Sequence, residues 1–244
     1  AEGPVAAAGV FTTNRVKAAP VLVCRARLRR GTARAILVNS GNANACTGPQ
    51  GLKDARELTR EAARLLKVSP GAVLPASTGV IGQPLPAARI RAALPELVAK
   101  LRPEGLPDAA QAIMTTDTRP KTAYIRETLW GRPVTLAGMA KGAGMIHPNM
   151  ATLLSFVFTD AAISPGVLRE VLGQAAEASF NRISVDGDTS TNDTLLLLAG
   201  GRAGNDLVTD IREAAPFAEL LTRLLSDLAR QVVADGEGVT RLFR

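Results

Sequence analysis

The chain has 244 residues, which suffices for one large domain or two small ones with a buried core. Its formal net charge is +7, but the basic residues are dispersed and lack stacking aromatics or a DNA- or RNA-binding motif, so we expect no nucleic-acid partner. No apolar run approaches the roughly 20 residues that span a bilayer, and there is no secretory leader, so we expect a cytoplasmic protein without membrane contacts.

Apolar patterning predicts strands and helices in alternation along the chain. Strands are predicted at 35–39, 73–75, 123–129, 132–136, 153–158 and 194–199. Helices are predicted at 51–67, 86–101 and 214–234, and a further helix opens at Ser164-Pro165 with a proline near its first turn. A hairpin is expected to turn at Trp130-Gly131. Segments 103–107 and 200–205 are predicted loops, and neither is long enough to be a domain linker.

The most informative stretch runs from Lys141 to Thr152, where a glycine-bearing loop ends in Ala151-Thr152 directly before an apolar, strand-like run. If the Thr152 hydroxyl attacks the Ala151 carbonyl and cuts the chain, Thr152 becomes a new N-terminus. Its freed α-amino group, with an ordinary pKa of roughly 7.7–8.0, can then activate the adjacent hydroxyl as a base. Ala-Thr pairs are common and most are inert, so this pair is informative only together with other motifs.

Six segments, this stretch among them, carry a resemblance to a known family. They occur in the family's order from near the first residue to near the last: 9–14, 38–48, 76–82, 141–152, 179–193 and 235–238. On these segments the chain resembles the bifunctional ornithine acetyltransferases of arginine biosynthesis, which are also glutamate N-acetyltransferases. Six matches in order are far more specific than any single motif.

The resemblance implies an α/β fold with mixed sheets layered with helices, as in the self-cleaving aminopeptidases and ornithine acetyltransferases. It also implies a division at the cleavage site. Residues 1–151 would be the α-chain portion and residues 152–244 the N-terminal part of the β-chain portion, with both sharing one core. Two α and two β chains would assemble as a heterotetramer. The family's distal tail, which supplies further substrate contacts, has no counterpart in this sequence.

For catalysis, the resemblance implies cleavage between Ala151 and Thr152 and makes Thr152 the nucleophile. Thr78 and Gly79 match the family's oxyanion hole, the pair of donors that stabilises the negatively charged transition state of acyl transfer. One such donor is worth about 3–4 kcal/mol, and a glycine N–H can approach closely because no side chain intervenes. Without the resemblance, Ser77-Thr78-Gly79 would be interpreted as an ordinary turn.

For substrate binding, the resemblance implies contacts from Thr115, Lys141 and Glu237 as well as from Thr152. An ammonium at Lys141 suits the α-carboxylate of an amino acid, and a carboxylate at Glu237 suits the ammonium of ornithine. The neighbouring Thr116 leaves the register of Thr115 open by one residue. On sequence alone, Glu237 would be interpreted as a surface loop residue, whereas Lys141, which could be a solvated loop lysine, is mildly informative because lysines are scarce in the chain.

The implied reaction moves an acetyl group from N2-acetylornithine to glutamate through an acetyl-Thr152 intermediate. Some members of the family also use acetyl-CoA, which leaves acetyl-CoA open as a co-substrate, and no cofactor is expected. Two alternatives remain open. One is a hydrolase of the self-cleaving aminopeptidase type, which passes the acyl group to water, and the other is a catalytically silent binding protein of the same fold.

The remaining polar residues give weaker signals. Segment 186–193 superficially resembles a calcium loop, but Thr191 and Leu197 stand where such a loop needs glycine and glutamate, so we expect no metal. The role of this segment cannot be assigned from sequence. Asn39, Asn42 and Asn44 predict a polar turn network, and the single histidine, His147, suggests a conformational role. Two cysteines, Cys24 and Cys46, allow one disulfide, but we expect reduced thiols.

Overall fold

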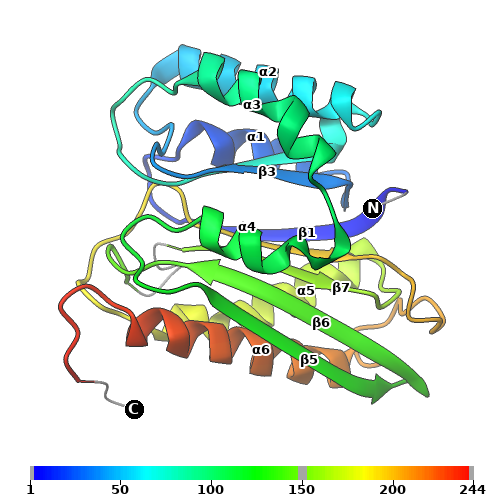
Figure 1. The fold of residues 1–244 in the computed structure, drawn as a ribbon. Helices are drawn as coiled ribbons and strands as arrows, with labels where there is room; N and C mark the ends of the chain where they lie inside the picture. The colour runs from blue at the N-terminus through cyan, green and yellow to red at the C-terminus, as the bar shows by residue number, and fades with distance from the viewer. Residues whose placement is uncertain (1–2, 148–152, 242–244) are drawn as a thin grey trace.

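The computed structural model describes residues 3–147 and 153–241 and contains two sheets (Figure 1). The strands are β1 (Val5–Phe11), β2 (Thr32–Ala33), β3 (Ala35–Asn39), β4 (Val73–Ser77), β5 (Lys121–Leu129), β6 (Arg132–Lys141), β7 (Leu154–Thr159) and β8 (Thr194–Ala199). The helices are α1 (Ala19–Leu28), α2 (Gly48–Leu65), α3 (Ala87–Ala99), α4 (Leu106–Ala112), α5 (Pro165–Glu177) and α6 (Ala215–Ala234). Short 3-10 turns occupy Pro70–Ala72, Pro103–Gly105 and Phe180–Arg182.

The large sheet has the strand order β2-β1-β8-β7-β6-β5, while β3 and β4 form a separate parallel pair. Strands β7 and β8 are parallel to each other, and β1 and β6 flank them in antiparallel pairing. The two central strands therefore follow residue 151 in the chain, whereas both of their outer neighbours precede it. Neither side of residue 151 contains the whole of the large sheet.

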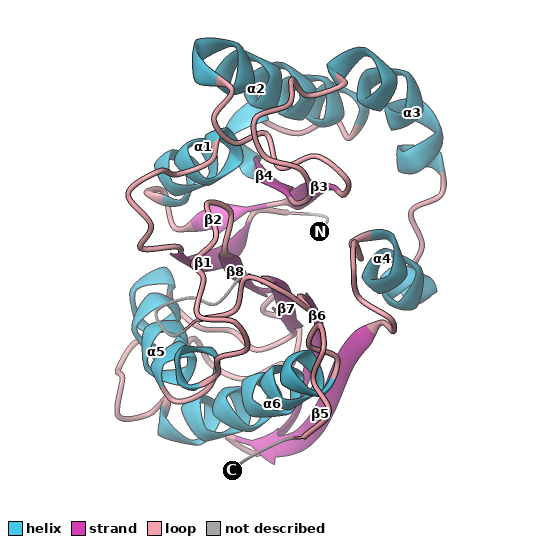
Figure 2. Ribbon diagram, turned by 90° about the vertical axis from the view of Figure 1, so that its left-hand side faces the viewer, coloured by secondary structure: helices cyan, strands magenta, loops and turns pink. Residues whose placement is uncertain are grey.

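The sheet is covered on both faces, as Figures 1 and 2 show: α5 and α6 lie against one face, and α4 and the β3–β4 layer with α1, α2 and α3 lie over the other. Side chains alternate between the two faces along each central strand. Val157 and Leu197 belong to the core beneath α5 and α6, whereas Phe156 and Leu196 pack in the opposite core with Cys24 and Leu74. The expected α/β fold with helices layered on mixed sheets is therefore confirmed.

The periodic segments form the predicted elements with small shifts at their ends, except that β6 continues past the predicted end at 136 to Lys141. β8 has the predicted bounds, and the hairpin turns at Trp130 (φ 53°) and Gly131 (φ 70°), the left-handed pair that a type I′ turn requires. The prediction of a loop at 103–107 is wrong in its second half, because α4 begins at Leu106 with Pro107 in its first turn, a position that proline tolerates.

Three elements had no prediction. β1 has the sequence VAAAGVF, whose alanines and glycine are poor strand formers, and it becomes a strand because β2 and β8 pair with its two edges. α1 is buried along much of its length and lacks a clear apolar stripe, and β2 contains only two residues.

Both thiols are free, as expected, with Cys24 buried and Cys46 exposed, and burial raises the pKa of the Cys24 thiol. Within residues 3–147 and 153–241, none of the helices has the length and apolar character needed to span a membrane.

Candidate active site

A pocket of about 690 Å³ gathers the predicted site residues that the structure describes. Thr78, Gly79, Thr115, Lys141 and Glu237 all line it. They come from the end of β4, the loop before β5, the end of β6 and the loop after α6, so the fold brings together residues from distant parts of the sequence. The predicted cleavage pair, Ala151 and Thr152, lies outside the described residues.

Lys141 connects two of these residues. Its side chain is buried at the end of β6, and its Nζ donates hydrogen bonds to Thr115 Oγ1 (2.7 Å) and Thr78 Oγ1 (3.1 Å). Burial lowers the pKa of the Lys141 ammonium, while the carboxylate of Asp117, 3.9 Å away, opposes that effect. The contact with Thr115 distinguishes this residue from Thr116, which lines the pocket without it.

The Thr78-Gly79 turn follows β4 directly. The Thr78 N–H donates to the Asn39 carbonyl (3.1 Å), which leaves the hydroxyl as the polar group that Thr78 offers to the pocket. A hydroxyl that accepts from Lys141 still has its own proton to donate. Gly79 has φ 131°, and a Cβ there would lie 2.2 Å from the Gly41 carbonyl carbon, so this close approach of two backbones requires glycine.

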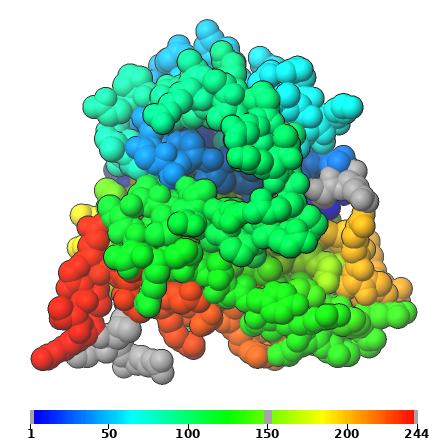
Figure 3. Space-filling view, in the orientation of Figure 1, coloured from blue at the N-terminus to red at the C-terminus, as the bar shows by residue number. Residues whose placement is uncertain are grey.

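Glu237 reaches the same pocket from the loop after α6. Its N–H donates to the Ala143 carbonyl (2.7 Å), and a Cβ built on Gly144 would lie 3.1 Å from the Glu237 carboxyl carbon. The carboxylate therefore lies against the glycine-bearing loop that follows β6. Figure 3 shows the C-terminal segment, in red, beside the green part of the chain.

A buried ion-pair network beneath the pocket was not predicted. Lys121 at the start of β5 is fully buried, and its Nζ donates to Asp117 Oδ1 (2.5 Å) and Asp235 Oδ2 (2.6 Å). Asp117 also accepts from the N–H groups of Gly142 (2.7 Å) and Thr115 (3.2 Å). The network thus ties together the backbone beside Lys141, Thr115 itself and the segment that carries Glu237.

Electrostatics keep this network charged. Burial acts to raise the pKa of Asp117, but the hydrogen bonds from Lys121 and the Gly142 N–H outweigh it, so the pKa lies below its usual range. No sequence motif marks the network, because Asp117 and Lys121 lie in a loop and a strand, where a spacing of four residues does not imply contact. In the sequence, Asp117 lies two residues after Thr115, and Asp235 begins the 235–238 motif, whereas Lys121 belongs to neither segment.

The predicted asparagine turn network is present. Asn39 Nδ2 donates to the Asn42 carbonyl (2.8 Å), and Asn42 Oδ1 accepts the Asn44 N–H (2.8 Å). Asn192, which had no assigned role, donates to the carbonyls of Ala43 (2.6 Å) and Ser77 (2.8 Å). These bonds hold the wall of the pocket that contains Thr78 and Gly79.

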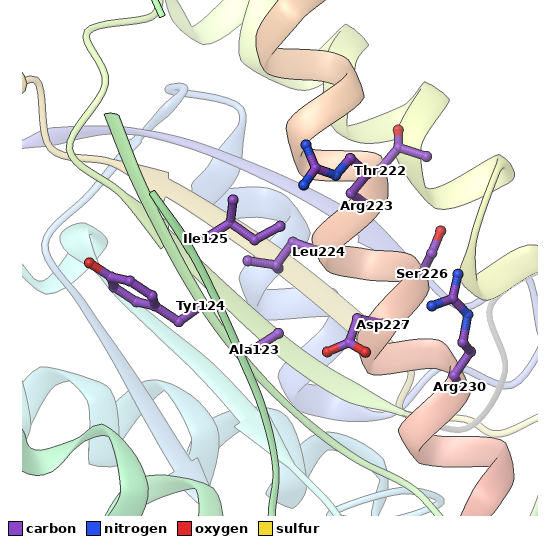
Figure 4. Close-up of a pocket in the computed structure, with 9 residues that line it drawn as sticks. All are labelled: Ala123, Tyr124, Ile125, Thr222, Arg223, Leu224, Ser226, Asp227 and Arg230. Carbon is purple, nitrogen blue, oxygen red and sulfur yellow. The ribbon is translucent and has the colours of Figure 1, made fainter. Parts of the chain in front are cut away.

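A second, smaller hollow of about 390 Å³ lies between β5 and α6 (Figure 4). Two of its charged side chains pair with nearby groups: Arg223 with Glu127 (2.6 Å), and Asp227, which accepts from Gln231 (2.9 Å). The hollow contains none of the predicted site residues, so the larger pocket is the candidate active site. Among the described residues, no group of three or more His, Cys, Asp or Glu side chains could hold a metal ion.

Known proteins resemble the chain along its whole length. It matches the ArgJ family over residues 1–244. It is 54% identical to the arginine biosynthesis bifunctional protein ArgJ of Symbiobacterium thermophilum over 98% of this chain and 60% of that protein. It is also 54% identical to the protein of the same name from Geobacter sulfurreducens, over 98% of this chain and 61% of that protein. The chain therefore spans about three fifths of the length of these relatives.

Solved structures of an ArgJ protein and of an ornithine acetyltransferase also match the chain. ArgJ from Bacillus halodurans matches with a TM-score of 0.57 at 41% identity, over 62% of this chain and 79% of that one. Ornithine acetyltransferase from Mycobacterium tuberculosis, complexed with ornithine, matches with a TM-score of 0.52 at 38% identity, over 62% of this chain and 78% of that one. An aminopeptidase from Ochrobactrum anthropi, described as a variant of the Ntn hydrolase fold, shares the fold alone. It matches with a TM-score of 0.56 at 10% identity, over 96% of this chain and 74% of that one. With a family match over all 244 residues and relatives at 54% identity, the chain belongs to the ArgJ family.

Proposed function

We propose that the chain is the part of an ArgJ enzyme that cleaves itself before Thr152 and transfers acetyl from N2-acetylornithine to glutamate. The observation that carries the proposal is the convergence of Thr78, Lys141 and Glu237 in one pocket. A hydroxyl donor, a cation and a carboxylate are the groups that an acetylated, zwitterionic amino acid needs. The pocket also borders the loop that leads toward the proposed nucleophile.

Self-cleavage makes the nucleophile. The Thr152 hydroxyl adds to the Ala151 carbonyl carbon, the Ala151–Thr152 C–N bond breaks, and the hydroxyl proton passes to the departing amine. Water then hydrolyses the resulting ester, which leaves a carboxylate on Ala151 and a free hydroxyl beside the new α-amino group of Thr152.

Acetyl transfer then proceeds in two displacements. The Thr152 hydroxyl attacks the acetyl carbonyl, its proton moves to the Thr152 α-amino group, and the Thr78 hydroxyl and Gly79 N–H stabilise the oxyanion. The C–N bond to ornithine breaks, the leaving amine takes the proton, and acetyl-Thr152 remains. The amine of glutamate attacks this ester, its proton returns to the Thr152 oxygen, and N-acetylglutamate leaves.

The polar residues of the pocket have separate roles in this scheme. Lys141 orients the Thr78 hydroxyl through their 3.1 Å contact and binds the α-carboxylate of the substrate, with Thr115 as its other partner. Glu237, on the Gly144 side of the pocket, binds the ammonium of ornithine. Acetyl-CoA as a further donor, an assembly of two α and two β chains, and a cytoplasmic location complete the proposal.

The two portions, 1–151 and 152–244, would remain associated after cleavage. The pairings β1–β8 and β6–β7 cross the division, and Ile146 and Leu153 belong to the same core cluster. Separating the portions would expose the central strands of the sheet.

The test is the fate of the acetyl group. The purified protein is incubated with N-acetylornithine in the presence and absence of glutamate, and ornithine, N-acetylglutamate and acetate are quantified. We expect N-acetylglutamate to form in amounts equal to the ornithine released. Acetate release that does not depend on glutamate would indicate the hydrolase instead, and no release with either mixture would indicate the silent binding protein.

A further inference from the structure

Segment 184–194, whose role the sequence left unassigned, holds both flanks of the proposed cleavage segment 147–152. Ile146 precedes that segment and Leu153 follows it. Both side chains are buried, at 0% and 1% exposure, in the same core cluster. In each of these residues, the backbone N–H and the carbonyl both bond to segment 184–194.

The upstream flank is held by Asp186. Its Oδ1 accepts the Ile146 N–H (2.8 Å), and its Oδ2 accepts the N–H of Met145. The Ile146 carbonyl accepts in return from the Val185 N–H (2.8 Å). Burial acts to raise the pKa of Asp186, but the N–H groups of Asp188, Met145 and Ile146 outweigh it and lower this pKa, so the group holds the flank as a carboxylate.

The downstream flank is held by Asp193. Its Oδ1 accepts the Leu153 N–H (3.1 Å), and the Leu153 carbonyl accepts from the Thr194 N–H (3.0 Å). Asp193 is fully buried, and within the described part of the chain its Oδ2 has no hydrogen-bond partner. The Thr12 hydroxyl nearby donates to the Ser190 carbonyl instead (2.7 Å).

The environment of Asp193 differs from that of Asp186. Burial is the largest influence on Asp193 and raises its pKa well above the usual range of a carboxyl. A buried carboxyl that keeps an oxygen without a partner lowers the stability of the fold, since burying an unpaired polar group is unfavourable. The nearby hydroxyls of Thr12 and Ser190 act to lower this pKa, but burial outweighs them.

We propose that Asp186 and Asp193 are positioning residues for self-cleavage, which fix the two ends of segment 147–152 so that the Thr152 hydroxyl meets the Ala151 carbonyl. The proposal rests on the proposed function, because it concerns the step that creates its nucleophile. Both reacting groups lie between these two flanks in the sequence. Correct positioning of reacting groups accelerates intramolecular attack, and a displacement of 1 Å can slow a reaction on the order of 10²-fold.

The experiment follows the appearance of the two fragments in the full chain by denaturing electrophoresis and mass spectrometry. Asp186→Ala and Asp193→Ala remove the acceptors, and Asp193→Asn keeps an amide oxygen for the Leu153 N–H. Asp188→Ala is the matched control, because this exposed neighbour contacts Asp186 only through its own backbone N–H. Circular dichroism and thermal unfolding identify the variants that fold.

We expect Asp186→Ala to slow cleavage on the order of 10²-fold, Asp188→Ala to cleave at the wild-type rate, and Asp193→Asn to cleave faster than Asp193→Ala. If Asp193→Ala does not fold, the cleavage rate of Asp186→Ala alone tests the proposal, because the Asp186 side chain is exposed and its loss should not prevent folding. A folded Asp186→Ala that cleaves as fast as the wild type overturns the proposal while the proposed function stands. A wild-type chain that never cleaves overturns both.

Discussion

Lys141 Nζ lies 3.1 Å from Thr78 Oγ1 and donates a hydrogen bond to it, although the two residues are 63 positions apart in the sequence. The contact joins the end of β6 to the end of β4 and thus one sheet to the other. A hydroxyl that accepts from Lys141 keeps its own proton for donation, as the proposed role of Thr78 in the oxyanion hole requires.

Replacing Thr78 by alanine removes this hydroxyl and leaves the Gly79 N–H in place. A donor that acts on developing charge stabilises the transition state more than the bound substrate, so kcat should fall on the order of 10²-fold while KM changes little. Steady-state transfer from N-acetylornithine to glutamate by the processed variant measures both constants. A raised KM with an unchanged kcat would assign Thr78 to substrate binding instead.

Replacing Lys121 by methionine keeps most of the side-chain volume and leaves two buried carboxylates, Asp117 and Asp235, without their cation. Breaking a buried ion pair from one side typically lowers stability by about 3–5 kcal/mol. Chemical denaturation should therefore show a large loss in the free energy of unfolding. Lys100→Met is the matched control, because its pair with Glu96 is about two-thirds exposed, and it should change little. Equal, small effects of both substitutions would argue against a stabilising network.

The lowered pKa of Asp117 predicts a pH dependence of stability. A carboxyl whose pKa is lower in the folded state stabilises the fold above its ordinary pKa of about 3.9 and loses that contribution as the pH falls through the folded value. The wild type should unfold at a higher temperature than Asp117→Asn near neutral pH, and this difference should shrink below about pH 4. Melting curves across pH 2–7 test it, and a constant difference would contradict the ion-pair assignment.

Part of this account was predictable from the sequence. β8 follows from a continuous apolar run, and the hairpin β5–β6 follows from alternation and turn residues, because these signals act over a few positions. Five described site residues were found through the family resemblance, and the pocket contains all of them. β1 was missed because its alanine-rich sequence becomes a strand only through its partners, which lie far away in the chain.

The supporting contacts could not be predicted for a similar reason. Lys121 bonds to Asp235 across 114 positions, and Asp186 and Asp193 hold backbone groups some 40 positions away. Neither periodicity nor spacing encodes such pairings, because tertiary structure creates them. The matched motif at 179–193 did point to an important segment, but its role emerged only from the contacts with Ile146 and Leu153.

Cleavage of the chain depends on one hydroxyl in the proposed mechanism. Thr152→Ala should therefore remain a single chain, whereas Thr152→Ser should still cut because it keeps a hydroxyl at the same position. Intact-mass spectrometry of the purified proteins distinguishes one chain from two fragments. An alanine variant that splits between residues 151 and 152 like the wild type would exclude attack by Thr152.

The acetyl-enzyme intermediate is the central claim, and peptide mass spectrometry tests it most directly. The processed protein is incubated with N-acetylornithine alone, quenched in acid and digested. The peptide that begins at Thr152 should gain the mass of one acetyl group, and it should lose that mass when glutamate is added before the quench. An unlabelled Thr152 peptide, together with kinetics that require both substrates bound at once, would contradict the covalent route.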